Sequence, residues 1–364
     1  MVVVVPVFLL VFVCSDSLFV YDCINAEKTT LGNKGQDGKP TDKGSDDILA
    51  FAFSPSGDYF ALTDDSKRLV LFHTKPSWEC VSVRSVNRRG TSLIITAAED
   101  KILVADKSGD VYSYSITEPQ AEGKLELGHL SLLLDVALSP DDQYILTADR
   151  DEKIRVSLAK APHYIVSYCL GHKDGLSLPE VLLDSTLRLW EYKSGEEVYC
   201  CHLSSICGPE TTKTDQVCPC VLVLLIPTVY VFQLDATAQQ LVYRQKISLT
   251  HKIWDIAFEE TGDLWILEEN SEAPLQLYRP CDGQWKAEIM AGINTCLVFL
   301  LCPIAGFVGA ESHYSCLYKA SFDNMAAYLQ RKEERLKQQK KKRQDLQHGS
   351  NGQTKKMKTE ESSL

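Results

Sequence analysis

The chain has 364 residues, of which 45% are hydrophobic and 24% are charged, a balance typical of globular proteins. Its net charge of −11 is unevenly distributed, because residues 331–364 carry 11 Lys/Arg against 5 Asp/Glu and so leave −17 on the rest. This distribution excludes bulk electrostatic attraction between the body of the chain and nucleic acid. Only a local basic patch or the tail could make such contacts.

The first 14 residues, MVVVVPVFLLVFVC, are almost entirely apolar. They lack a positively charged start and a clear cleavage site, and the run is short for a membrane span. Val and Phe favour strands, so we expect one or two buried strands here. A secretory signal and an atypical start of the chain are the alternatives. Residues 24–47 are polar and rich in Gly, Lys and Asp, which predicts a mobile surface loop.

Short strand-like runs then alternate with turn residues. Ile48–Thr74 and Thr91–Ile116 each have the pattern strand, turn, strand, turn, strand, and His251–Pro280 repeats it. The segment Gly128–His172 opens and closes with a Gly-His pair, and the two pairs are 43 residues apart. A period of about 40–45 residues is typical of a WD-type propeller blade. We therefore predict an all-β, WD40-type β-propeller with nominally seven blades over residues 1–322.

The histidine of each Gly-His pair can bridge to an aspartate in a tight turn, because buried polar groups must be paired. The candidate pairs are His129 with Asp151 and His172 with Asp184. We interpret these four residues as architectural and not as catalytic.

Two segments break the repeat. The interval from Gly171 to Trp190 is 19 residues, against 29 for the equivalent interval from Gly128 to Ser157, so the fourth unit is 10 residues short. Val221–Leu234 joins two apolar runs through Pro227 without a proper turn. We expect one or two irregular or shortened blades in this region.

The C-terminal part changes character. Residues 323–347 contain no Gly or Pro and predict a basic helix, and residues 348–364 predict a disordered basic tail. Nuclear import, RNA contact and a merely solvated tail are all compatible with the basic clusters. These clusters consist of Lys340, Lys341, Lys342, Arg343, Lys355, Lys356 and Lys358.

Motifs for catalysis and metal binding are absent from the sequence. There is no phosphate-binding glycine loop, no Gly-x-Ser-x-Gly elbow and no His-Glu-x-x-His helix, so we expect a protein that is not itself an enzyme. The 13 cysteines have no zinc-site spacing, which favours buried thiols in a reducing compartment and no metal.

Several segments carry a specific resemblance. Tyr59–Leu69, Val104–Ser113, Val231–Asp235 and above all Leu146–Ser157 resemble the WD-repeat, non-catalytic subunit of the tRNA (guanine-N7)-methyltransferase of animals. The resemblance implies a nuclear scaffold that forms a heterodimer with a separate catalytic subunit. That subunit would bind S-adenosylmethionine and methylate a guanine in the tRNA variable loop, while this chain binds no cofactor and helps to position the tRNA.

The same resemblance implies a docking site at the end of the Gly128–His172 unit. Arg155 would pair with an acidic side chain of the catalytic subunit, and Asp151, Glu152 and Lys153 would add polar contacts. Arginine suits this role because its planar guanidinium can bind a carboxylate through two hydrogen bonds. The alternative for Arg155 is a solvated strand residue, and Asp151 has the turn described above as its other assignment.

Propellers also serve as substrate receptors of cullin-type ubiquitin ligases, and this is the alternative function. The usual mark is a Trp-Asp-x-Arg box at the end of a blade. Trp190-Glu191-Tyr192-Lys193 is an imperfect version of that box.

Overall fold

The structure is a computed structural model of the chain. It describes residues 2–5, 9–14, 17–22, 27–32, 47–172, 186–203, 220–225, 228–259, 262–270 and 273–288. The chain divides into two compact units, Met1–Tyr318 and Lys319–Leu364. The second unit lies outside the described residues, so the helix predicted over 323–347, the tail over 348–364 and their boundaries stay predictions.

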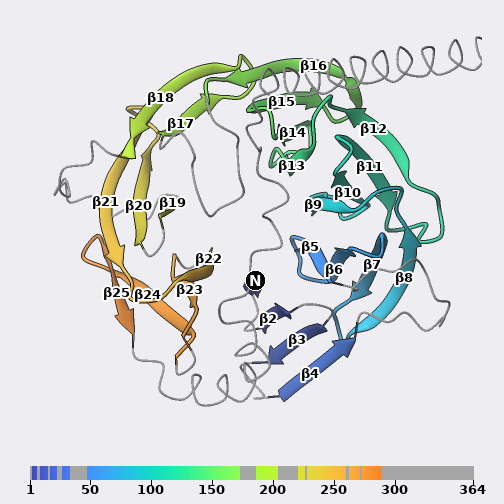
Figure 1. Ribbon diagram of the computed structural model, residues 1–364, viewed down its shortest axis with the longest axis horizontal. Coiled ribbons are helices and arrows are strands. Elements are labelled where there is room, and N and C mark those ends of the chain that lie inside the picture. The colour runs from blue at the N-terminus through green and yellow to red at the C-terminus, as the bar shows by residue number, and fades with distance from the viewer. Residues whose placement is uncertain are drawn as a thin grey trace, which may run out of the picture. The chain divides into compact units, whose positions relative to one another are not determined.

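Every regular element in the described part of the first unit is a β-strand, and the strands form seven sheets that follow one another in chain order (Figure 1). All pairings are antiparallel between strands that are consecutive in the chain. The first three sheets are formed by β1 (Val2–Val5), β2 (Leu9–Cys14), β3 (Ser17–Asp22) and β4 (Glu27–Gly32); by β5 (Ile48–Phe53), β6 (Tyr59–Asp64), β7 (Arg68–His73) and β8 (Glu79–Ser85); and by β9 (Gly90–Ile95), β10 (Lys101–Asp106), β11 (Asp110–Ser115) and β12 (Lys124–Gly128).

The other four sheets complete the series. They are formed by β13 (Leu133–Leu138), β14 (Tyr144–Asp149), β15 (Lys153–Leu158) and β16 (Ala161–Leu170); by β17 (Thr186–Glu191) and β18 (Glu196–His202); by β19 (Cys220–Leu225), β20 (Thr228–Asp235) and β21 (Gln240–Ser248); and by β22 (Ile253–Phe258), β23 (Leu264–Glu268), β24 (Leu275–Cys281) and β25 (Gln284–Glu288). Strand β1 contacts β22, which brings the first sheet against the last. The predicted all-β propeller is confirmed.

The β9–β12 sheet is covered on both faces by its neighbours, which explains why its middle strands are apolar at consecutive positions. In β10, Ile102 and Val104 pack into the cluster shared with the β5–β8 sheet. Leu103, the residue between them, points to the opposite face and packs with Leu133 and Ile145 of the β13–β16 sheet. Since side chains alternate along a strand, one short apolar run serves two interfaces.

The structure corrects two local predictions. Glu27–Gly32 forms β4 and pairs with β3, so the surface loop predicted over residues 24–47 is wrong for this stretch. Strands β19 and β20 pair antiparallel with Leu225 opposite Thr228, so the two apolar runs on either side of Pro227 are paired strands of one sheet. The N-terminal apolar run forms β1 and β2, which confirms the strand interpretation.

The irregular region falls partly outside the described residues. Two strands are described for the fifth sheet and three for the sixth, and residues 173–185 and 204–219 between and beside them are not described. The shortened blade predicted there stays a prediction.

Candidate protein-docking site

A turn of the same form connects the second and third strands in each of three neighbouring sheets. Asp64, Asp106 and Asp149 each end the second strand, and all three are buried. In each turn the residue three positions later, Lys67, Gly109 or Glu152, has a positive φ and donates its backbone N–H to the aspartate carbonyl. The carboxylate then accepts backbone N–H groups of the turn, which fixes the turn from inside.

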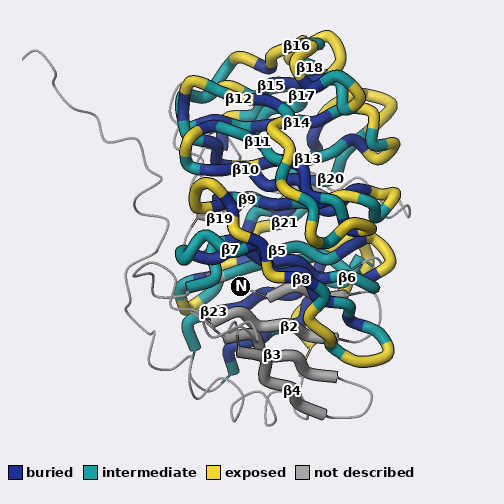
Figure 2. Tube along the Cα trace, turned by 90° about the vertical axis from the view of Figure 1, so that its right-hand side faces the viewer, coloured by how far each residue is buried: buried dark blue, intermediate teal, exposed yellow. Residues whose placement is uncertain are grey.

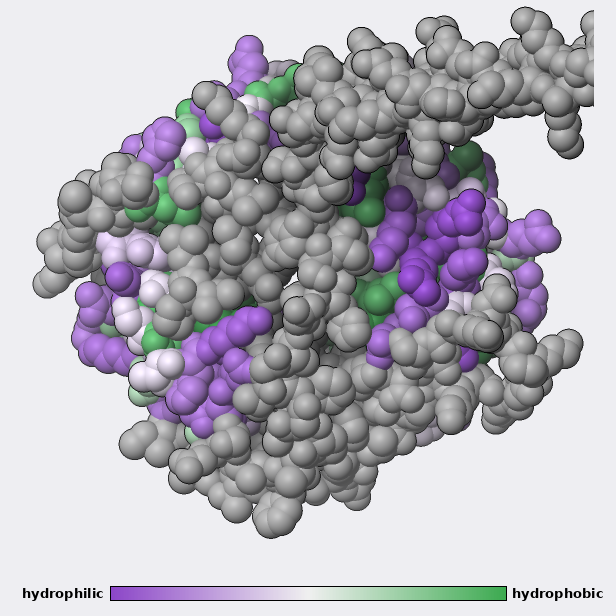
Figure 3. Space-filling view, in the orientation of Figure 1, coloured by the Kyte–Doolittle hydropathy of each residue, from purple (hydrophilic) through white to green (hydrophobic). Residues whose placement is uncertain are grey.

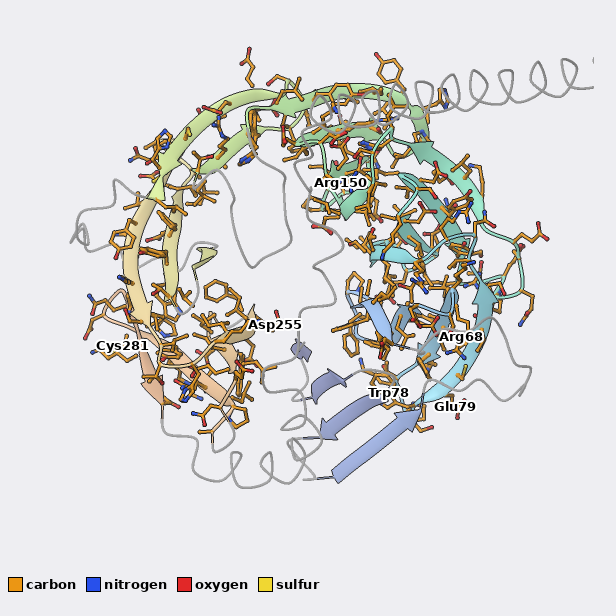
Figure 4. The ribbon with its side chains drawn as sticks, in the orientation of Figure 1. Arg68, Trp78, Glu79, Arg150, Asp255 and Cys281 are labelled. Atoms are coloured by element: carbon orange, nitrogen blue, oxygen red, sulfur yellow. The ribbon has the colours of Figure 1, made fainter. Side chains whose placement is uncertain are left out.

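The turn between β14 and β15 carries the predicted docking residues Asp151 and Glu152. The Oδ1 atom of Asp149 accepts hydrogen bonds from the backbone N–H groups of Asp151 at 3.0 Å and Lys153 at 3.1 Å. The backbone N–H of Arg150 donates to the carbonyl of Leu132 at 2.9 Å, which ties the turn to the loop before β13. Figure 4 shows Arg150 at this end of strands β13–β15.

The structure corrects the partner of His129. Its Nδ1 atom lies 3.1 Å from Oδ2 of Asp149, and its Nε2 atom lies 2.8 Å from Oγ1 of Thr147. The predicted pairing of His129 with Asp151 is wrong, because Thr147 and Asp149 lie on the same face of β14 and occupy both ring nitrogens. Asp151 lies in the turn itself, where its backbone N–H binds Asp149. Asp184 lies outside the described residues, so its pairing with His172 stays a prediction.

A related arrangement recurs in the last sheet, where the sequence did not indicate one. The Nδ1 atom of His251 lies 3.5 Å from Oε2 of Glu268, which ends β23 and is fully buried. Burial raises the pKa of the Glu268 carboxyl group. A histidine thus lies beside a buried acid at both places, but of the two only His129 is itself buried and hydrogen-bonded to the acid.

Acidification is expected to weaken the fold through His129. Burial lowers the pKa of its imidazole below the ordinary value of 6.5, an effect larger than the opposing effect of Asp149. Below pH 6.5 the unfolded chain takes up a proton that the folded chain excludes, so this contribution to stability is present above pH 6.5 and falls as the pH drops toward the folded pKa. The thermal unfolding midpoint should fall less for His129→Asn than for the wild type between about pH 7.5 and about pH 5.5. Equal pH dependences would contradict this assignment.

The side chain of Arg155, in β15, is buried against β16 and the end of β12 and does not lie in solvent. It is 7% exposed, so the solvated alternative is wrong. Its guanidinium donates to Oγ of Ser157 at 2.9 Å, to the carbonyl of Gly128 at 3.0 Å and to the carbonyl of Pro162 at 2.9 Å. Burial lowers the pKa of the guanidinium, which nevertheless stays charged. Arg155 thus joins β15 to β16 and to the end of β12, and its pairing with a partner's carboxylate stays a prediction.

The remaining predicted docking residues lie on the turn. Asp151 and Glu152 are half-buried and Lys153 is exposed. Glu152 holds the strained position, with a φ of 68°. In the ladder between β15 and β16, Lys153 is opposite Leu170 and Arg155 is opposite Tyr168. The four predicted docking residues therefore lie together, and Tyr168 and Leu170 are two further neighbours that no sequence motif indicated.

Other kinds of site find little support in the described part of the chain. No group of three or more His, Cys, Asp or Glu side chains there could hold a metal ion. None of its elements is a helix with the length and apolar character needed to cross a membrane. Hydrophilic residues gather on the visible face over strands β9–β11 (Figure 3), so this face offers polar contacts.

The chain is similar to solved WD40 structures. It superposes on a chain of "Structure of U3-55K" with a TM-score of 0.59 and 18% identity, covering 74% of this chain and 88% of that one. A chain of "Crystal Structure of Mitotic Checkpoint Complex" gives a TM-score of 0.58 at 10% identity, covering 74% of this chain and 86% of that one. At such identities the likeness supports the fold alone.

Sequence relatives are much closer. The human "tRNA (guanine-N(7)-)-methyltransferase non-catalytic subunit WDR4" is 53% identical over 344 residues, covering 87% of this chain and 83% of the relative. The zebrafish (Danio rerio) subunit of the same name is 42% identical and covers 94% of this chain and 91% of the relative. The family model described as the tRNA methyltransferase TRM82 WD40 domain matches residues 24–124 and 114–274, which include the β14–β15 turn. The chain therefore belongs to the TRM82 WD40 family, whose relatives are named as non-catalytic subunits of tRNA (guanine-N7)-methyltransferases.

Proposed function

We propose that this chain is the non-catalytic subunit of a tRNA (guanine-N7)-methyltransferase. It forms a heterodimer with the catalytic subunit, stabilises that subunit and helps to position tRNA for methylation of a guanine in the variable loop. The observation that carries the proposal is the 53% identity to the human non-catalytic subunit over 87% of this chain. The methyl donor S-adenosylmethionine binds to the catalytic subunit and not to this chain.

The β14–β15 turn suits a docking role because it is rigid before any partner arrives. Asp149 fixes the backbone of Asp151 and Lys153, and Arg150 is tied to Leu132. The turn then loses less conformational entropy on binding a partner than a flexible loop would. In this proposal the turn presents polar groups of Asp151, Glu152 and Lys153 to the catalytic subunit. Arg155 follows two residues after Lys153 in β15 and is buried.

Reconstitution tests the proposal. The purified chain, the purified catalytic subunit and tRNA are combined, and methyl transfer to the guanine N7 is measured for each protein alone and for both together. Strong activity only with both proteins supports a scaffold role. Full activity of the catalytic subunit alone, or the absence of a complex between the two proteins, contradicts it.

Reversing the charge of Lys153 is expected to weaken assembly. Lys153 is exposed at the turn, so Lys153→Glu should raise the dissociation constant of the heterodimer by about tenfold, mostly through slower association at low salt. The matched control is Lys160→Glu, an exposed lysine in the turn that follows β15. Calorimetry at two salt concentrations measures both variants, and an equal loss for both would rule out a local role of the turn.

The C-terminal basic clusters complete the proposal. They lie outside the described residues, and we assign them to nuclear import, to tRNA contact or to both. Fusing residues 323–364 to a fluorescent protein and following its location separates import from tRNA contact.

The ubiquitin-ligase alternative rested on the imperfect box at Trp190–Lys193. The human and zebrafish relatives bear names of methyltransferase subunits instead.

A further inference from the structure

Strand β16 exposes an unusual number of apolar side chains. Seven large hydrophobic side chains are exposed among the described residues, and four of them belong to β16. Exposed positions along this strand are visible in Figure 2. Scattered exposed leucines need no explanation, but a concentration on one surface strand marks an interaction site. These four residues are Tyr164, Ile165, Tyr168 and Leu170.

The strand also lacks the usual protection of a sheet edge. Strand β16 is the last strand of its sheet and is ten residues long. Its sequence, APHYIVSYCL, contains no Lys, Arg, Asp or Glu. The last strand of each of the other six described sheets carries two charged residues, and charges on an edge prevent unwanted pairing. These charged residues are Glu27 and Lys28, Glu79 and Arg84, Lys124 and Glu126, Glu196 and Glu197, Arg244 and Lys246, and Lys286 and Glu288.

The register places two of the apolar residues beside the docking turn. Leu170 is opposite Lys153, and Tyr168 is opposite Arg155. Opposite residues of an antiparallel pair lie on the same face of the sheet, and so do residues two apart on one strand. Lys153, Arg155, Tyr168 and Leu170 therefore form one compact block on a single face.

A third apolar side chain belongs to the same end of the sheet. Leu130 is fully exposed, with a relative exposure of 108%. The loop that carries it is held against the turn, because the neighbouring His129 ring binds Asp149 and the carbonyl of Gly128 accepts from Arg155. Leu130, Tyr168 and Leu170 are called the apolar patch below.

Energetics favours the apolar patch over the charged turn as the source of affinity. Exposed ion pairs contribute about 0–1 kcal/mol, and the Arg155 guanidinium already has three internal acceptors. Most binding energy at protein interfaces comes from a few buried aromatic and apolar anchors surrounded by polar groups. Tyr168 and Leu170, bordered by Lys153, have this arrangement.

We propose that the apolar patch is the main contact surface for the catalytic methyltransferase subunit, and that the β14–β15 turn sets its orientation. This inference rests on the proposed function. The catalytic subunit would cover Tyr168, Leu170 and Leu130 with an apolar surface and place charged groups around it to match Glu152 and Lys153. The apolar patch adjoins the β14–β15 turn, which the proposed function assigns to the catalytic subunit. This subunit is therefore favoured over an unrelated partner as the protein that covers the patch.

Substitutions to serine in full-length protein test the inference. Tyr168→Ser and Leu170→Ser should each raise the dissociation constant for the purified catalytic subunit at least about tenfold, and Leu130→Ser should weaken binding in the same direction. Two matched controls lie on other sheets: Val83→Ser, 39% exposed like Tyr168, and Leu125→Ser, 54% exposed against 60% for Leu170. Both controls should bind like the wild type. Tyr168→Phe should also bind normally, since it keeps the apolar ring.

The outcomes separate this inference from the proposed function. Thermal unfolding first establishes that each serine variant is folded, and Tyr168→Phe supplies a second measure at the same position. If patch variants bind normally while Lys153→Glu weakens binding, the inference is overturned and the proposed function stands. If patch and control variants lose affinity equally, the inference is overturned as well. If the wild-type chain forms no complex, the proposed function fails and this inference fails with it.

Discussion

Replacing Arg155 with alanine is expected to lower the free energy of unfolding by about 3–5 kcal/mol, before any effect on a partner is considered. Arg155 is 7% exposed, and its guanidinium donates to Ser157 and to the carbonyls of Gly128 and Pro162. Truncation removes the donor to the buried carbonyl of Pro162 and to the part-buried carbonyl of Gly128, and it opens a cavity. Chemical denaturation of the isolated chain measures the loss.

Arg155→Lys and Lys160→Ala are the controls for this prediction. A lysine keeps the charge but cannot bind three acceptors at once, so Arg155→Lys should lie between the wild type and Arg155→Ala. The exposed Lys160 should change stability by less than about 0.5 kcal/mol. If Arg155→Ala keeps the stability of the wild type but loses the catalytic subunit, the guanidinium acts at the interface, as the family resemblance implies. Assembly must therefore be measured at a temperature where the variant is folded.

The architecture could be predicted from the sequence because its signals are local. Turn residues at Ser54–Asp58 and Asp64–Lys67 separate short apolar runs, and β5, β6 and β7 fall on those runs. The Gly-His period then supplies the repeat. Strand β4 was missed because its residues are polar, and only the pairing with β3 makes Glu27–Gly32 a strand.

The contacts of the docking site could be predicted only in part. The Gly-His pair and the acidic turn indicate a histidine–carboxylate bond, but two aspartates are within reach in the sequence. Alternation along β14 would have favoured Asp149, since it shares a face with Thr147 and both bind the ring of His129. Burial of Arg155 could not be foreseen, because its acceptor at Gly128 belongs to the neighbouring sheet. The exposure of Tyr168 likewise depends on which sheet lies against β16. The absence of charged residues from residues 161–170 nevertheless distinguishes this strand in the sequence.

Asp149 is expected to contribute more to the docking turn than any residue that contacts a partner. Asp149 is 2% exposed, and its carboxylate binds the N–H groups of Asp151 and Lys153 and the ring of His129. Hydrogen bonds to a charged group contribute about 1.5–3 kcal/mol each, so Asp149→Ala should lower the free energy of unfolding by about 3–5 kcal/mol. Denaturant titration of Asp149→Ala and the wild type measures this loss. Asp151→Ala, in the same turn but half-buried, should cost less than about 1 kcal/mol.

The comparison of the two aspartates also decides which of them organises the docking surface. If Asp149 fixes the turn, Asp149→Ala should lower both stability and affinity for the catalytic subunit, because Lys153 loses its fixed position. Asp151→Ala should leave stability nearly unchanged and reduce affinity only through its own contacts. The reverse order of stabilities would restore Asp151 as the partner of His129. With Asp149 as the partner of His129, adding His129→Asn to Asp149→Ala should cost little more than Asp149→Ala alone, because both changes break the same bond.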